Sequence, residues 1–154
     1  TMGAEGLTPV SHADPRGFAK VEKTNFTAVY RLIRSLEPLL RASDAGRAIF
    51  VTSGASWKHS AYWGPYTATK AALNALTEAF AFEYGPKVRV NTISPGRFLT
   101  DVSKAWPEEH KANPTAALKR SGQPEEIVTA ALYLASSKSS FTTGSLVRVD
   151  GGIA

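Results

Sequence analysis

The sequence predicts an α/β fold with about three parallel strands, and three features of the 154-residue chain support this prediction. Short, continuous apolar segments, typical of strands buried on both faces, alternate with longer segments of helical periodicity. After an opening helix the order is strand, helix, strand, helix, strand, which predicts parallel pairing through right-handed crossovers. The length and the hydrophobic content of 43% suit a single domain over residues 1–154.

The opening helix is predicted to begin at Asp14, because an aspartate followed by Pro15 is typical of a helix N-cap. Its apolar residues recur at steps of three and four as far as Leu40, which indicates one buried face. We expect Pro38 to distort the last turns. The first strand is "AIFVTS" (residues 48–53), whose uninterrupted apolar and β-branched residues predict burial on both faces.

The rest of the chain repeats this alternation. The segment "GPYTATKAALNALTEAF" (64–80) predicts a second helix, and "VRVNTIS" (88–94) predicts the second strand. Residues 101–119 contain two prolines, a tryptophan and several charges, which indicates a mobile segment with short helices. The last helix opens at Gln123 with acids that suit the helix dipole, and "SLVRVD" (145–150) is the last strand.

The composition argues against several classes of function. Although the net charge is +5, the 18 Lys and Arg residues are spread among 13 acidic ones without a basic run, so we expect no nucleic-acid partner. The lack of cysteine removes disulfides, thiolate catalysis and cysteine-based metal sites. Without an 18-residue apolar span or an N-terminal signal, we expect no membrane insertion and a cytoplasmic protein.

A tyrosine and a lysine share one face of the second helix. Tyr66 and Lys70 are four residues apart, a spacing that the residue counts alone would produce roughly 0.3 times per chain. Two exposed surface residues are therefore the alternative reading. Ser53 strengthens the functional one, because it ends a predicted parallel strand thirteen residues before Tyr66. Ligands of open α/β sheets bind beyond those strand ends, so the two hydroxyls are expected to converge.

Two further features belong to the same pattern. Asn25 lies within the opening helix, between Thr24 and Thr27, where an amide does not favour helix formation. Pro95-Gly96 closes the second strand at the same end of the sheet, and Thr100 follows four residues after Gly96.

Together these segments resemble the short-chain dehydrogenases/reductases over nearly all of the chain. The matching motifs are "KTNFTA", "IFVTSGAS", "YTATK", "NTISPGRFLT", "RSGQPEEIVTAALYLAS" and "GSLVRVDGG". Their order and spacing are specific as a set, although each motif alone is weak. The resemblance implies the C-terminal portion of a Rossmann-like, doubly wound parallel sheet.

The resemblance also implies a reaction, namely hydride transfer between NAD or NADP and a small-molecule carbonyl or alcohol. Tyr66 would be the acid or base, because the carbonyl oxygen needs a proton as the carbon accepts hydride. Lys70 would lower the pKa of the phenol and hold the nicotinamide ribose. Ser53 would donate a hydrogen bond to the substrate oxygen, and Asn25 would hold a water that relays protons behind Lys70.

The nicotinamide carboxamide would be held by the turn after the second strand. The resemblance assigns this contact to the backbone of Pro95, Gly96 and Phe98 and to the hydroxyl of Thr100. It also implies a homodimer or homotetramer in which the long helix and the Tyr66 helix pack against a second subunit.

Several local alternatives remain open at this stage. Thr52 or Ser56 could replace Ser53 as the hydroxyl donor, and Asn25 could simply kink its helix. Thr100 could be a helix N-cap, alone or in addition to a cofactor contact. The three tryptophans could line a substrate pocket or cover the core: Trp57, Trp63 and Trp106. The histidines lack metal-ligand spacing, so no metal site is expected.

The glycine-rich phosphate-binding turn of a dinucleotide-binding fold does not occur in the sequence. We therefore expect a partial domain, corresponding to the last three of seven strands, and the sequence does not distinguish NAD from NADP. The alternative is a truncated, non-catalytic α/β module that pairs with another chain through an exposed sheet edge. The substrate depends on residues 54–64 and 101–119, whose composition specifies no compound.

Overall fold

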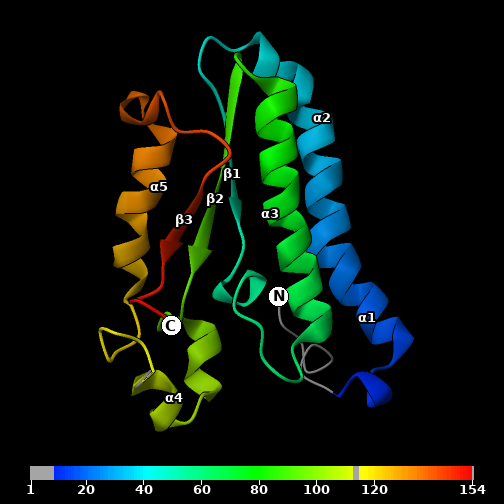
Figure 1. Ribbon diagram of the computed structural model, residues 1–154, viewed down its shortest axis with the longest axis vertical. Helices are drawn as coiled ribbons and strands as arrows, with labels where there is room; N and C mark the ends of the chain where they lie inside the picture. The colour runs from blue at the N-terminus through cyan, green and yellow to red at the C-terminus, as the bar shows by residue number, and fades with distance from the viewer. Residues whose placement is uncertain (1–8, 113–114, 154) are drawn as a thin grey trace.

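A three-stranded parallel sheet lies at the centre of the computed structural model, which describes residues 9–112 and 115–153 (Figure 1). The strands run in the order β1-β2-β3, with bounds Gly46–Val51, Val88–Pro95 and Leu146–Val149. β1 and β2 pair from Gly46↔Val88 to Val51↔Ile93. β2 and β3 pair from Thr92↔Leu146 to Pro95↔Val149. The predicted parallel sheet is confirmed.

A long helical rod and α3 cover one face of the sheet (Figure 1). The rod consists of α1 (Pro15–Glu22), a π-helical segment η3 (Lys23–Thr27) and α2 (Ala28–Ala42), and α3 spans Gly64–Tyr84. Asp14 is the predicted N-cap, and its carboxylate accepts a hydrogen bond from the N–H of Arg16 at 3.0 Å. This bond satisfies one of the donors that the first helical turn leaves unpaired.

The rod departs from α-helical geometry in η3. There the N–H of Ala28 donates to the carbonyl of Lys23, five residues earlier, and Asn25 is buried. The helix α2 continues through Pro38 to Ala42, so the distortion that we predicted around Pro38 does not interrupt it. Neighbouring packing therefore keeps this segment helical despite the N–H that proline lacks.

The opposite face of the sheet is covered by α5 (Val128–Ala135) (Figure 1). Alternate residues of β2 face the two layers: Val90 belongs to the cluster with α3, whereas Arg89 donates to the carbonyl of Leu134 in α5 at 3.2 Å. Each strand is added on the same side of the one before it, in the order β1-β2-β3. The helix α3 connects β1 to β2 on one face of the sheet, and α5 connects β2 to β3 on the other face. The two crossovers consequently have opposite hands, so the prediction that both are right-handed is wrong for one of them.

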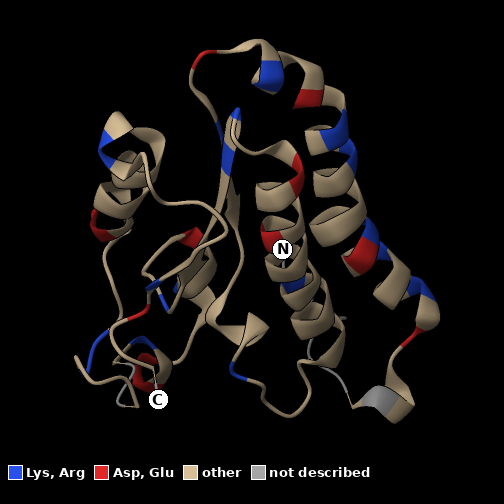
Figure 2. Cartoon of the chain, turned by 45° about the horizontal axis from the view of Figure 1, so that its top comes forward, with Lys and Arg blue, Asp and Glu red and all other residues tan. Residues whose placement is uncertain are grey.

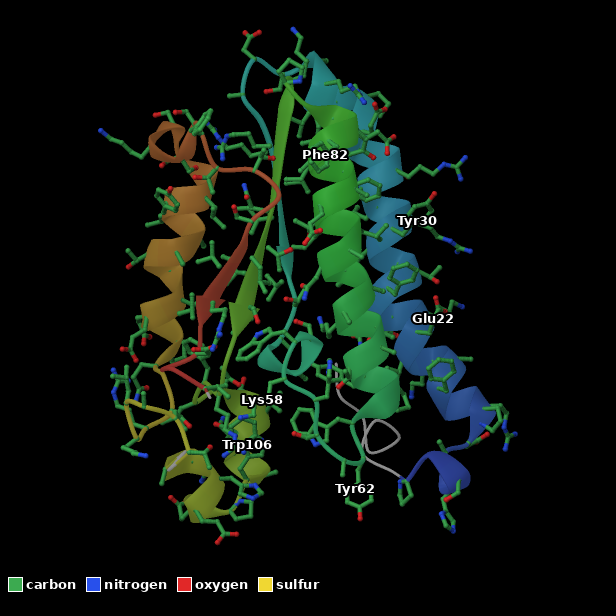
Figure 3. The ribbon with its side chains drawn as sticks, viewed as in Figure 1. Glu22, Tyr30, Lys58, Tyr62, Phe82 and Trp106 are labelled. Atoms are coloured by element: carbon green, nitrogen blue, oxygen red, sulfur yellow. The ribbon has the colours of Figure 1, made fainter. Side chains whose placement is uncertain are left out.

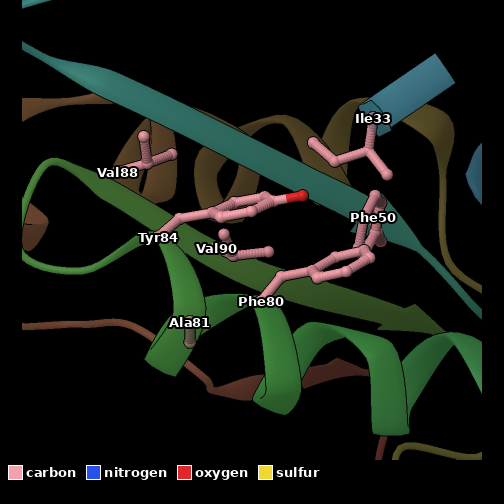
Figure 4. Packing of buried hydrophobic residues seen from close by; sticks show 7 residues of the cluster. All are labelled: Ile33, Phe50, Phe80, Ala81, Tyr84, Val88 and Val90. Carbon is pink, nitrogen blue, oxygen red and sulfur yellow. The ribbon is translucent and has the colours of Figure 1, made fainter. Parts of the chain in front are cut away.

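The main core lies between the sheet and the helices of the α3 face (Figure 4). The rings of Phe80 and Tyr84 stack with centroids 5.1 Å apart, and Phe50 of β1 meets Phe80 edge-on at 6.4 Å. The buried members of this cluster are Ile33, Phe50, Phe80, Ala81, Tyr84, Val88 and Val90. Apolar side chains from the sheet, α2 and α3 thus hold the two layers together.

Burial on both faces is a property of β2 rather than of β1. β2 is paired on both sides, whereas β1 is an edge strand within the described residues, and its Val51 is 55% exposed. Our prediction that "AIFVTS" is buried on both faces is therefore wrong at its end. An unpaired edge leaves neighbouring apolar side chains accessible, whatever their sequence pattern.

The remaining elements are short. They are η2 (Val10–His12), η4 (Gly54–Ser56), η5 (Asp101–Ala105), α4 (Glu108–Ala112), η6 (Pro124–Ile127) and η7 (Ser137–Ser139). The short helices that we predicted for residues 101–119 are confirmed by η5 and α4. Basic and acidic side chains are interspersed along the helices (Figure 2). In the described ranges no helix is both long and apolar enough to span a membrane.

Candidate active site

Ser53 and Tyr66 come from two elements that meet beyond the carboxyl end of β1. Ser53 is the N-cap of η4, where its Oγ accepts a hydrogen bond from the N–H of Ala55 at 3.2 Å. Tyr66 lies in the first turn of α3, next to Pro65. A strand that ends at a sheet edge and a helix that starts there bring the two side chains together, as predicted from the sequence.

The hydroxyl of Ser53 lies beside the phenol of Tyr66 and influences its pKa as a hydrogen-bonding neighbour, and both residues are half-buried. Burial raises the pKa of Tyr66 above its ordinary value, because a phenolate loses hydration more than a phenol does. The Ser53 hydrogen bond acts in the opposite direction, since it stabilises the phenolate, but it is the smaller effect. The ring of Trp63 packs edge-on against Tyr66, with centroids 6.1 Å apart, and contributes to this apolar environment.

Lys70 lies one turn further along α3. Its Nζ is 6.0 Å from the centroid of the Tyr66 ring and donates to the carbonyl of Val51 at 3.1 Å. Burial lowers the pKa of Lys70. We expected Lys70 to lower the pKa of Tyr66, but the net direction is the opposite, because the ammonium faces a β1 carbonyl and desolvation of the phenol dominates.

The other two hydroxyls near the end of β1 are engaged within the protein. Thr52 is buried and its Oγ1 donates to the carbonyl of Ile93 at 3.5 Å. Ser56 is also buried and donates to the carbonyl of Ser53 at 2.6 Å. Of these three hydroxyls, the one that influences the pKa of Tyr66 is that of Ser53.

Asn25 lies in the π-helical segment η3, which packs against α3, the helix of Tyr66 and Lys70. Asn25 is only 4% exposed. The π geometry agrees with the alternative that Asn25 marks an irregularity in the helix. Its predicted role in holding a water remains a prediction.

The turn after β2 brings two backbone segments into close contact. The N–H of Gly96 donates to the carbonyl of Val149 at 2.9 Å, so this donor is already used. A Cβ at Gly96 would lie 2.6 Å from the Cα of Asp150. Glycine is needed here because any side chain would collide with backbone atoms. The Pro95 carbonyl points away from β3, and a Cβ at Gly54 would lie 3.7 Å from its oxygen.

Phe98 lies at the same end of the sheet, and its backbone segment pairs with another segment on one side. It forms a parallel bridge with Gly122, in which Arg97 provides the carbonyl and Leu99 the N–H, each at 2.9 Å. In such a bridge the N–H and C=O of the central residue point away from the partner. The backbone of Phe98 is thus directed away from Gly122, the orientation that a carboxamide ligand would need.

Thr100 is the N-cap of η5 and forms a capping box with Ser103, whose Oγ accepts from the N–H of Thr100 at 3.0 Å. The N-cap alternative is therefore confirmed for Thr100. It also lines an open depression of about 580 Å³. The other residues around this depression are Leu99, Asp101, Ser103, Lys104, Lys111 and Pro124.

These groups fit the nicotinamide end of a dinucleotide. An ammonium has three donors, so Lys70 retains donors for ribose hydroxyls beyond the bond to Val51. Phe98 offers both a backbone donor and an acceptor. The pyrophosphate end has no counterpart, because the sequence contains no glycine-rich turn.

Sequence reasoning missed Asn74, which lies on the Tyr66 and Lys70 face of α3. Its Nδ2 donates to the Oγ of Ser56 at 2.9 Å. The repeated spacing of four residues along the helix could have identified it.

Trp57 covers the ends of β2 and β3. Its Nε1 donates to the Oγ of Ser94 at 3.2 Å, and the guanidinium of Arg148 lies 3.6 Å from its ring centroid. These contacts favour the covering role that we considered for the tryptophans. Within the described residues, no group of three His, Asp or Glu side chains could hold a metal ion.

Comparison with known proteins decides the family. The model of a family described as enoyl-(acyl carrier protein) reductase matches residues 2–154. The chain belongs to the short-chain dehydrogenase/reductase family. This membership confirms the resemblance drawn from the motifs and does not favour a non-catalytic module.

Relatives of this short-chain dehydrogenase/reductase include enzymes of different specificity. A 3α-hydroxysteroid dehydrogenase of Mediterraneibacter gnavus is 33% identical over 97% of this chain and 61% of its own length. A tropinone reductase homologue of Arabidopsis thaliana is 31% identical over 98% of this chain and 59% of its own length. The chain therefore spans about three fifths of the length of these relatives.

Solved structures of the family confirm the Rossmann-like fold. A 3-oxoacyl-[acyl-carrier protein] reductase from Brucella melitensis superposes with a TM-score of 0.90 at 32% identity, over 98% of this chain and 58% of that chain. A 7α-hydroxysteroid dehydrogenase complexed with NADH and 7-oxo glycochenodeoxycholic acid has a TM-score of 0.89 at 31% identity, over 99% of this chain and 61% of that chain.

Proposed function

We propose that this protein is an oxidoreductase that transfers hydride between NAD or NADP and a small-molecule carbonyl or alcohol, with Tyr66 as the acid or base. The convergence of Ser53 and Tyr66 beyond the carboxyl end of β1, with Lys70 on the next turn of α3, is the observation that carries the proposal. Two neighbouring hydroxyls at the carboxyl edge of a parallel sheet suit a substrate oxygen that gains charge. The relatives named above, a hydroxysteroid dehydrogenase and a tropinone reductase homologue, support this reading.

The bound nicotinamide supplies or accepts the hydride, and the residues of this chain manage the charge and proton on the substrate oxygen. In the reduction, Tyr66 donates its proton to that oxygen as the carbon accepts hydride. A raised pKa makes the phenol a weaker acid, so its proton donation relies on the negative charge that the substrate oxygen gains as hydride arrives. Ser53 donates a hydrogen bond to the same oxygen and stabilises its developing charge.

Lys70 and Asn25 would restore the proton that Tyr66 gives away. The Lys70 ammonium would bind the ribose hydroxyls and, in the oxidation, favour the phenolate by its charge. Asn25 would hold a water that connects Lys70 to solvent, and its burial in η3 beside α3 supports this position.

Orientation of the nicotinamide carboxamide would fall to the turn after β2. The backbone of Pro95, Gly96 and Phe98 forms this turn, with Thr100 at its end. We assign the carboxamide contact mainly to Phe98, because its N–H and C=O point away from Gly122. Holding the ring in one orientation selects the face that exchanges hydride.

Tyr66→Phe tests the proposal. The variant should lose about 10²- to 10⁴-fold in kcat, the range for removal of an acid–base group, while the cofactor Kd changes little. Tyr30→Phe is a matched control, because Tyr30 lies on α2, outside the segments on which the substrate is expected to depend (Figure 3). Turnover is followed in a protein that also carries the glycine-rich cofactor-binding half, by nicotinamide absorbance with both cofactors and a panel of ketones, including 3-oxoacyl thioesters. Wild-type kcat in Tyr66→Phe would exclude Tyr66 as the acid or base.

A homodimer or homotetramer that forms through α2 and α3 belongs to the same proposal, as does action in the cytoplasm. Large apolar side chains on these helices are exposed: Leu39 is 69% and Phe82 is 90% accessible. Tyr30 of α2 is 42% accessible, although its ring stacks on Phe80 of α3 with centroids 6.4 Å apart. Light scattering on the eluting protein measures the assembly, and a monomer at micromolar concentration would contradict it.

A further inference from the structure

A chain of side-chain hydrogen bonds connects α3 to the backbone of Ser53. Asn74 lies eight residues after Tyr66, so Tyr66, Lys70 and Asn74 share one face of the helix. The Nδ2 of Asn74 donates to the Oγ of Ser56 at 2.9 Å, and this Oγ donates to the carbonyl of Ser53 at 2.6 Å. Ser56 is buried, so water does not compete with these bonds.

The direction of the bonds explains why residue 74 carries an amide. Ser56 has one hydroxyl proton, and that proton is donated to the carbonyl of Ser53. The group that faces the oxygen of Ser56 must therefore be a donor, which an asparagine NH₂ provides and a carboxylate does not.

The amide of Asn74 does not clearly increase the free energy of unfolding. The Oδ1 of Asn74 is buried and has no hydrogen-bond partner among the residues that the structure describes. A buried acceptor without a partner costs free energy, so an apolar residue of similar size would be less costly at this position. The contact with Ser56 is the feature of Asn74 that offsets this cost.

We propose that Asn74 is a positioning residue, which acts through Ser56 to hold the Ser53 hydroxyl against Tyr66. Ser53 and Tyr66 belong to separate elements, and the Asn74–Ser56 bond connects the η4 turn to the helix that carries Tyr66. The catalytic consequence rests on the proposed function, but the geometric consequence does not. A small displacement of Ser53 would weaken the hydrogen bonds that the Ser53 and Tyr66 hydroxyls must both make to one substrate oxygen.

The first measurement compares turnover in three variants of a protein that also carries the glycine-rich cofactor-binding half. Asn74→Leu keeps the size of the side chain and removes the donor, and we expect kcat to fall roughly 10- to 100-fold with little change in KM for the cofactor. Ser56→Ala should cause a similar loss. The double variant should lose no more than Ser56→Ala alone, because both substitutions break the same chain of bonds.

Thr77→Val is the matched control. It removes a buried hydroxyl contact of α3, the 2.5 Å hydrogen bond between Thr77 and Thr92, one turn further from the candidate site. This variant should lower Tm without changing kcat. A purely structural role for Asn74 would give the same result in Asn74→Leu.

The second measurement needs neither cofactor nor turnover. The Tyr66 phenol is titrated by ¹³C NMR of tyrosine-labelled protein, with the signal assigned by comparison with Tyr66→Phe. Since the Ser53 hydrogen bond lowers the pKa of Tyr66, Asn74→Leu should raise it further, whereas Thr77→Val should leave it unchanged. Lys70, the charged neighbour of Tyr66 on α3, is present in all variants.

The titration decides the proposal. An unchanged Tyr66 titration in Asn74→Leu overturns it, whatever the turnover. If Asn74→Leu does not fold, Ser56→Ala takes its place under the same criterion. Activity that survives in Tyr66→Phe would instead refute the proposed function and leave the titration result for Asn74 standing.

Discussion

Gly96→Ala is the substitution whose effect follows most directly from the structure. A Cβ at this position would lie 2.6 Å from the Cα, 2.8 Å from the Cβ and 2.9 Å from the carbonyl oxygen of Asp150. These atoms belong to, or are attached directly to, the backbone that follows β3, so no side-chain rotation relieves the contact. Overpacking of this kind costs about 3 kcal/mol, at the upper end of the usual range. For a chain of this size that corresponds to a decrease in Tm of about 6–12 °C.

Gly54→Ala is the matched control on the other side of the site. Its Cβ would meet the Cδ1 of Ile153 at 3.4 Å and the carbonyl oxygen of Pro95 at 3.7 Å, both ordinary contacts. Replacement of glycine by alanine without strain restricts the unfolded chain and stabilises by about 0.4–1 kcal/mol. We therefore expect a rise in Tm of about 1–4 °C. Thermal unfolding by circular dichroism measures both variants, and equal melting temperatures would refute the reasoning.

Three further predictions concern stability and cofactor affinity. Hydrogen bonds from Arg120 lower the pKa of Glu126 from 4.5 to about 2, so its stabilising effect is present above pH 4.5 and is lost as the pH falls towards 2. Urea unfolding should show a smaller acid-induced loss of stability in Glu126→Gln than in the wild type, and an equal loss would contradict this. Asp14→Ala removes the N-cap of α1 and should cost about 1 kcal/mol, or about 2–4 °C in Tm, and an unchanged Tm would contradict it. The 154-residue chain expressed alone should show no micromolar affinity for NADH or NADPH in calorimetry, because it lacks the glycine-rich turn, and micromolar binding would contradict this.

The elements of the fold were largely predictable because their signals are local. The N-cap of α1 was predictable from Asp14 and the proline that follows it. The strand β2 was predictable from the mainly apolar, β-branched residues of "VRVNTIS". The exposed position of β1 as a sheet edge was expected for this chain, but the exposure of Val51 and the opposite hands of the crossovers were missed. Both depend on which strands and helices lie beside each other, and no short segment of sequence records that.

The candidate site divides in the same way. Tyr66, Lys70 and Ser53 were predicted from helical spacing and from the end of a strand, and the structure brings Ser53 to Tyr66. The direction of the Tyr66 pKa was not predicted, because spacing along a helix does not report how far a phenol is desolvated. Asn74 was missed since its partner Ser56 is eighteen residues away and its role depends on a hydrogen bond across two elements.

By itself, the sequence determined the order and type of the elements and the family, since helical periodicity, capping residues and motif spacing act over a few residues. The tertiary structure alone decided which face each helix covers and which hydroxyl lies beside the phenol of Tyr66. These properties arise from distances between segments far apart in the chain, and from the water that their packing excludes.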